Sequence, residues 1–224
     1  MDNLPISISL FFGITTLLTV FLFYKATQKS YTSIVILLLW LLLQAIVART
    51  GFYTFVTQPP RFPLLVGPTF LFIILLFVTA KGRNFIDTLD GKALTLLHIV
   101  RIPVEMVLFW LFLCKTVPQE MTFEGRNLDI ISGLSAPFIY YFGYVKQKLS
   151  RPILLCWNFL CLGLLTNIVL HAIFALPGLF QTYAFDQPNI AVMYFPFVWL
   201  PCCIVPLVLF SHLACIRQLL KKTS

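Results

Sequence analysis

LTLLHIVRIPVEMVLFWLFLCKT, residues 94–116, is an apolar stretch long enough to cross a bilayer, yet it contains His98, Arg101 and Glu105. A charge in hydrocarbon is costly unless it is paired or faces a cavity, so charged residues inside a span are candidates for functional residues. This stretch therefore indicates both the class of fold and the first place to look for a site.

The rest of the chain is just as apolar. Its 224 residues are 59% hydrophobic and 11% charged, with a mean hydropathy of +0.92, well outside the range of soluble proteins. A bilayer needs about 20 apolar residues per helix. That criterion predicts an all-α integral membrane protein, a bundle of seven transmembrane helices forming one domain over residues 1–224. The spans are expected at about 6–25, 32–56, 62–80, 94–116, 129–145, 152–176 and 191–216.

The basic residues predict an orientation. With the N-terminus outside and the C-terminus inside, eleven of the 16 Lys and Arg residues fall on the inner side, three on the outer side and two within spans, as the positive-inside rule requires. The net charge of +8 is then an orientation signal and a contact for anionic membrane lipids, rather than a nucleic-acid surface. We expect the first span to be a retained helix, because its flank MDNLP lacks the basic residues of a signal peptide.

The three polar residues of 94–116 share one helical face. At 100° per residue, Arg101 and Glu105 lie about 60° and 20° from His98, and Pro103 between them removes one helical hydrogen bond, that of the Ile99 carbonyl. Two arrangements are open. In the first, Arg101 and Glu105 pair with each other one turn apart, and His98 forms a hydrogen bond to another helix. In the second, all three side chains face a polar site.

Other spans carry further polar residues. Arg49 lies in the outer third of the second span, where it either joins a site or reaches the outer headgroups. Asn167 and His171 lie one turn apart on the sixth span and either line a site or bond neighbouring helices. His212 is expected at the inner interface. Two arginines against one glutamate would favour an anionic group.

These residues predict a polar pocket between the second, fourth, sixth and seventh spans, open to the outer side. The acidic connection with Glu120, Glu124 and Asp129 is expected to lie at the outer opening of this pocket. The predicted ligand-binding residues are Arg49, Arg101, Glu105, Asn167, His171 and Trp199.

No motif indicates a cofactor. Nucleotide-binding glycine motifs and helical metal-binding pairs are absent from the sequence, so we predict no metal and leave the cofactor unknown. Two weaker alternatives stay open: a haem between His98 and His212, and a metal held by His171, Glu105 and a carboxylate of the outer loop.

Three functions fit this sequence. The first is a receptor-like or binding module for a small anionic or amphipathic ligand. The second is a membrane-embedded enzyme acting on a lipid or quinone-like substrate, with Glu105 or His171 as the catalytic general acid/base. The third is a proton-coupled transporter. Short loops and the absence of glycosylation sequons favour a multi-pass protein of a bacterial cytoplasmic membrane.

Overall fold

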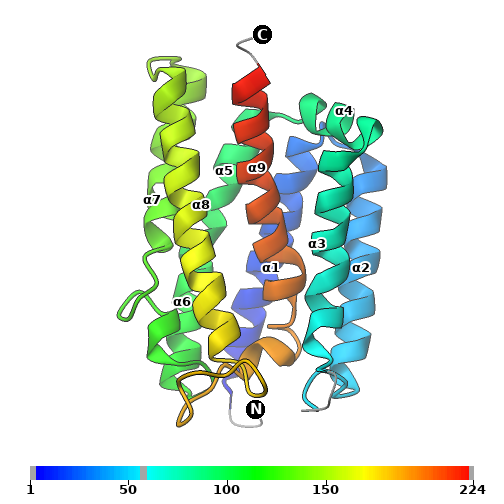
Figure 1. The fold of residues 1–224 in the computed structure, drawn as a ribbon, viewed down its shortest axis with the longest axis vertical. Helices are drawn as coiled ribbons and strands as arrows, with labels where there is room; N and C mark the ends of the chain where they lie inside the picture. The colour runs from blue at the N-terminus through cyan, green and yellow to red at the C-terminus, as the bar shows by residue number, and fades with distance from the viewer. Residues whose placement is uncertain (1–3, 56–59, 222–224) are drawn as a thin grey trace.

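The computed structural model describes residues 4–55 and 60–221, and within these ranges all regular structure is helical (Figure 1). The α-helices are α1 (Ile6–Ala26), α2 (Tyr31–Arg49), α3 (Phe62–Val78), α4 (Ala80–Thr88), α5 (Gly91–Leu97), α6 (Arg101–Leu113), α7 (Ile130–Phe138), α8 (Arg151–Phe174) and α9 (Val205–Lys221). The 3₁₀ segments are η1 (His98–Val100), η2 (Gln119–Met121) and η4 (Ala191–Met193), and the π-helical segments are η3 (Ile139–Val145) and η5 (Leu200–Ile204).

In the described ranges, five helical segments are long and apolar enough to cross a membrane: Ile6–Ala26, Tyr31–Arg49, Gly91–Leu113, Arg151–Phe174 and Leu200–Lys221. A sixth candidate is the pair α3 and α4, which bend by 92° at their junction. The segment Ile130–Val145 is apolar but shorter than the about 20 residues that a span needs. The chain is a helical membrane protein with five or six candidate spans, and a seventh span remains a prediction.

Two boundaries differ from the sequence prediction. The second helix ends at Arg49 rather than near Val56, because Gly51 adopts a left-handed φ of 72° that ends the helix. The last helix begins at Leu200 rather than at 191, after the irregular segment around Pro196. Val56 itself lies outside the described residues, as does Lys222 of the predicted inner side.

The predicted inner loop 81–92 contains a helix, α4, that turns almost perpendicular to α3. The hydroxyl of Thr79 accepts a hydrogen bond from the Gly82 amide at 3.1 Å and so caps α4. A Cβ on Gly82 would lie 2.3 Å from the Leu76 carbonyl oxygen, so only glycine permits this sharp bend. Asp87 on α4 then pairs with Arg217 at 3.0 Å and with Lys221 at 2.7 Å on α9.

The centre of the bundle is α9, which is mostly buried; α5 and α8 pack against it, and α1 packs against α5 and η5 (Figure 1). By contrast, α2 lies at the edge and is mostly exposed. Exposed apolar residues recur at helical spacing on α1, for example Ile6, Leu10, Ile14, Leu17 and Phe21. Such a face is stable in lipid and not in water, which agrees with the membrane class. The start of α1 and the end of α9 lie at opposite ends of the bundle (Figure 1).

Candidate functional site

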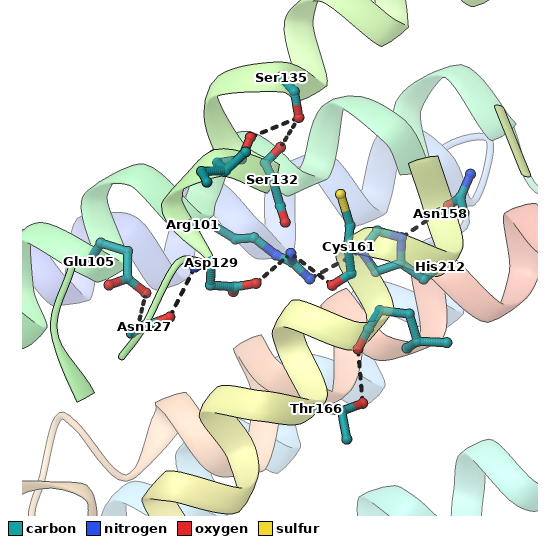
Figure 2. Close-up of polar contacts among 12 residues, drawn as sticks. Arg101, Glu105, Asn127, Asp129, Ser132, Ser135, Asn158, Cys161, Thr166 and His212 are labelled. Carbon is teal, nitrogen blue, oxygen red and sulfur yellow. Dashed lines mark hydrogen bonds and ion pairs between the residues drawn. The ribbon is translucent and has the colours of Figure 1, made fainter. Parts of the chain in front are cut away.

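Arg101 is the centre of a buried polar cluster. Its Nη1 donates to Asp129 Oδ1 at 2.7 Å, and its Nη2 lies 3.1 Å from His212 Nε2. Figure 2 shows the guanidinium between these two partners. Arg101 is 3% exposed and Asp129 5%, so the guanidinium is neutralised inside the bundle by a carboxylate from another helix. Breaking such a buried pair costs about 3–5 kcal/mol.

His212 connects the arginine to α8. Its Nδ1 lies 2.9 Å from Asn158 Oδ1, which orients the ring, and its ring stacks on His98 with centroids 3.8 Å apart and an interplanar angle of 15°. Trp157 packs against both histidines. Neither nitrogen of His98 has a hydrogen-bond partner among the described residues. His212 was expected at the inner interface, and it is instead fully buried.

Glu105 has a different partner. Its Oε1 accepts from Asn127 Nδ2 at 2.5 Å, and the same amide nitrogen donates to the Met121 carbonyl at 3.0 Å. The Asn127 oxygen accepts from the Asp129 amide at 3.0 Å, so one asparagine holds the connection 117–129 against Glu105. The second oxygen, Oε2, is buried and has no hydrogen-bond partner in the described part of the chain. The alternative of a closed Arg101–Glu105 pair is therefore wrong.

The fold brings Asp129 to Arg101 through a close helix contact. A Cβ on Gly133 would lie 2.9 Å from Ile102 Cγ1 and 3.1 Å from the Ile102 backbone nitrogen. Glycine at this position lets α7 approach the η1–α6 junction. The 3₁₀ turn at His98–Val100 falls directly before Pro103, which cannot donate to the Ile99 carbonyl.

Glu105 and Asp129 line a cavity of about 130 Å³ between α3, α6, α8 and η5. The rest of the lining is apolar except for Asn189, whose Nδ2 donates to the Ala172 carbonyl at 3.2 Å. A larger cavity of about 420 Å³ at the N-terminal end of α3 shares four lining residues with it: Phe62, Val66, Ile173 and Leu176. The two spaces therefore adjoin one another.

Of the six predicted binding residues, only Glu105 lines this cavity, and Arg101 reaches it only through Asp129. Arg49 is exposed at the end of α2, with its guanidinium 4.8 Å from the centroid of the Phe195 ring. Trp199 donates from Nε1 to the Leu41 carbonyl at 3.0 Å. The cavity lies against α3 rather than α2, so the structure does not bring Arg49 and Trp199 to the same space as Glu105.

Asn167 and His171, on α8, take part in hydrogen bonds to the connections before α7 and after α8. Asn167 Nδ2 donates to the Arg126 carbonyl at 2.9 Å. His171 Nδ1 lies 2.9 Å from the Asn167 carbonyl, and the Tyr183 hydroxyl donates to the His171 carbonyl at 2.7 Å. Neither residue lines the cavity of Glu105. Asn167 thus bonds the connection before α7, whereas the hydrogen bond of the His171 ring lies within α8; neither of these contacts is the bond to a neighbouring helix that the alternative described.

The two metal alternatives find no support in the geometry. In the described ranges, no group of three or more His, Cys, Asp and Glu side chains is arranged to hold a metal ion. A haem between His98 and His212 requires the rings to stand on opposite sides of an iron atom, whereas these rings are in direct stacking contact.

The sequence did not identify Asn127 as a site residue, and Asp129 was expected at the outer opening of the pocket. Asn127 is fully buried, although it lies in a polar connection between two predicted spans. One signal was available: a buried arginine requires an anionic partner, and Asp129 is an acid at the first position of a predicted span. Nothing in the sequence alone identifies Asn127 as the partner of Glu105.

A family model described as "Domain of unknown function (DUF8737)" matches residues 62–220. The chain belongs to this family. The DUF8737 region includes the whole polar cluster, from His98 to His212, and the cavity beside it, whereas α1 and α2 precede it. No curated protein and no solved structure matches the chain.

Proposed function

We propose that this membrane protein is a receptor-like or binding module that holds a small amphipathic molecule in the cavity between α3, α6, α8 and η5. The observation that carries the proposal is that Glu105 lines this apolar space and that its buried Oε2 has no hydrogen-bond partner among the described residues. A buried polar atom without a partner is costly, and a bound molecule with a polar group would remove that cost.

The size of the cavity supports a small ligand. An engineered apolar cavity of about 150 Å³ is known to bind benzene, and the space beside Glu105 is about 130 Å³. The adjoining cavity of about 420 Å³ at the start of α3 offers room for a longer molecule. In the predicted orientation, with the N-terminus outside a bacterial cytoplasmic membrane, this larger space faces the outer side.

The cavity supports binding better than the other two functions. His171, one of the two candidate acid/base residues, does not line the cavity, which leaves Glu105 as the candidate at this space. Among the described residues, Glu105 contacts Asn127 rather than a titratable group that could pass a proton on. No observation favours transport.

Thermal unfolding in detergent with three probes tests the proposal. The probes are 4-phenylbutylamine, 4-phenylbutan-1-ol and 4-phenylbutyrate, which share an apolar body and differ only in the head group. We expect at least one of them to raise the unfolding midpoint in a saturable manner, since a ligand at 100 times its Kd stabilises by about 2.7 kcal/mol.

Matched variants locate the binding. Ala172→Trp fills the cavity and is expected to abolish the saturable shift, whereas Leu170→Trp on the exposed surface of α8 is expected to retain it. Val169→Phe, also on the lining, serves if Ala172→Trp does not fold. The proposal fails if no probe gives a saturable shift, or if the filled and control variants respond alike.

A further inference from the structure

Two residues that line the cavity carry a side-chain oxygen without a hydrogen-bond partner. Glu105 Oε2 and Asn189 Oδ1 are both buried, and neither has a hydrogen-bond partner within residues 4–55 and 60–221. Glu105 is 2% exposed and Asn189 1%. The amide nitrogen of Asn189 is already engaged with Ala172. The lining therefore offers unsatisfied acceptors to a ligand that donates hydrogen bonds.

The charge at the cavity also favours a ligand that donates hydrogen bonds. Its charged lining residues are Glu105 and Asp129. The Arg101 guanidinium neutralises Asp129 at 2.7 Å, while Glu105 accepts a hydrogen bond from the neutral amide of Asn127. When Glu105 is ionised, two carboxylates and one guanidinium leave one negative charge. A buried charge needs a counter-charge, and among the described residues no second cation lines this space.

The arginines do not favour an anion here. Arg101 already has Asp129 and His212 as partners, and Arg49 lies exposed against Phe195. An anionic head group entering the cavity would meet the carboxylate of Glu105. The sequence expectation of an anionic ligand rested on two free guanidinium groups, and neither is free to line the cavity.

We propose that the ligand is a small amine whose protonated nitrogen binds Glu105, with Asn189 as a further acceptor and an apolar body packed against α3 and α8. This inference rests on the proposed function and specifies the chemical class of its ligand. An ammonium group supplies both the missing positive charge and up to three hydrogen-bond donors, and a charge-assisted hydrogen bond is stronger than a neutral one.

The three phenylbutyl probes give the test when their affinities are measured at neutral pH, where the amine is protonated and the carboxylate ionised. We expect the amine to bind at least about tenfold more tightly than the alcohol, as a charge-assisted hydrogen bond implies. We expect the carboxylate to bind more weakly than both. Carboxylate affinity equal to or above that of the amine overturns the inference.

Two isosteric variants assign the preference to its residue. Glu105→Gln keeps the shape and removes the charge, and it is expected to lower amine affinity by about tenfold while changing alcohol affinity much less. Glu124→Gln on the exposed outer connection makes the same change in charge and is expected to have no effect. An unchanged amine affinity in Glu105→Gln contradicts the inference.

The possible failures are distinct. If the alcohol binds at the Ala172-sensitive site as tightly as the amine, the cavity binds ligands but is not selective for a cation, and only this inference fails. If none of the three probes binds there, the proposed function fails as well. Should Glu105→Gln not fold, the order of the three affinities in the unmodified protein still decides the question.

Discussion

Arg101 keeps its charge inside the bundle because partners on two other segments reach it. Asp129 supplies the opposite charge and His212 a further contact, at 2.7 and 3.1 Å. The desolvation cost of burying such a pair is large, so its net contribution to stability is small while both partners are present. Removing one partner is different, because the other is then left as an uncompensated buried charge.

Asp129→Asn is therefore expected to destabilise the fold by about 3–5 kcal/mol. The double variant Arg101→Met with Asp129→Leu is expected to recover most of this loss, because apolar residues of similar volume replace a buried pair with little cost. Unfolding in detergent with increasing denaturant measures both. Glu124→Gln, an exposed acid in the same connection, serves as the control and is expected to change stability by less than about 0.5 kcal/mol. A small effect of Asp129→Asn contradicts the assignment.

At the scale of the elements, side-chain hydrogen bonds and ion pairs join several of the helices to one another. Pro206 cannot donate to the Cys202 carbonyl, and Trp40 on α2 donates to that carbonyl instead, from Nε1 at 3.0 Å. Trp199 makes a matching bond in the other direction, to Leu41. The carbonyl that Pro206 leaves without a helical donor thus binds the exposed helix α2. Near the C-terminal end of α9, Asp87 joins α4 to α9 by ion pairs.

The contact of α4 with α9 predicts a pH dependence. Hydrogen bonds from Arg217 and Lys221 lower the pKa of Asp87 below its ordinary value of 3.8. Because the folded-state pKa is lower than the unfolded one, the stabilisation is fully present above the unfolded value and is lost as the pH falls through the folded one. We expect wild type to exceed Asp87→Asn in stability at pH about 6 and to converge with it only as the pH falls below the folded-state pKa, which itself lies below 3.8. Unfolding midpoints of both proteins across this range measure it, and a difference that does not depend on pH contradicts it.

At the scale of the whole molecule, the chain surrounds α9 with amphipathic and apolar helices whose exposed faces suit lipid. The polar cluster lies inside, between α6, α7, α8 and α9. The cavity adjoins it on the side of α3. The cavity shares lining residues with the larger space at the start of α3. The helix α4 and the start of α1 lie at opposite ends of the bundle (Figure 1).

The distribution of basic residues predicts that α4 faces the cytoplasm and the connection 117–129 faces outward. Glu124→Cys is expected to react with a membrane-impermeant maleimide in intact cells, and Lys81→Cys only after lysis. Both positions are exposed, so access is decided by the membrane alone. The protein without an introduced cysteine gives the background of the six native ones. Labelling in the reverse order contradicts the predicted orientation.

The sequence by itself determined the membrane class and the approximate position of the long apolar helices, because apolar length and interruption by proline, glycine and charge are local properties. It also identified Arg101 and Glu105 as unusual, since a charge in an apolar span is visible without any partner. Only the tertiary structure decided the partners: Asp129 and His212 for Arg101, and Asn127 for Glu105. These depend on contacts between segments far apart in the chain, such as the close approach at Gly133. The same contacts decide the sign of the charge that faces the cavity, because an arginine that is already paired no longer attracts an anion.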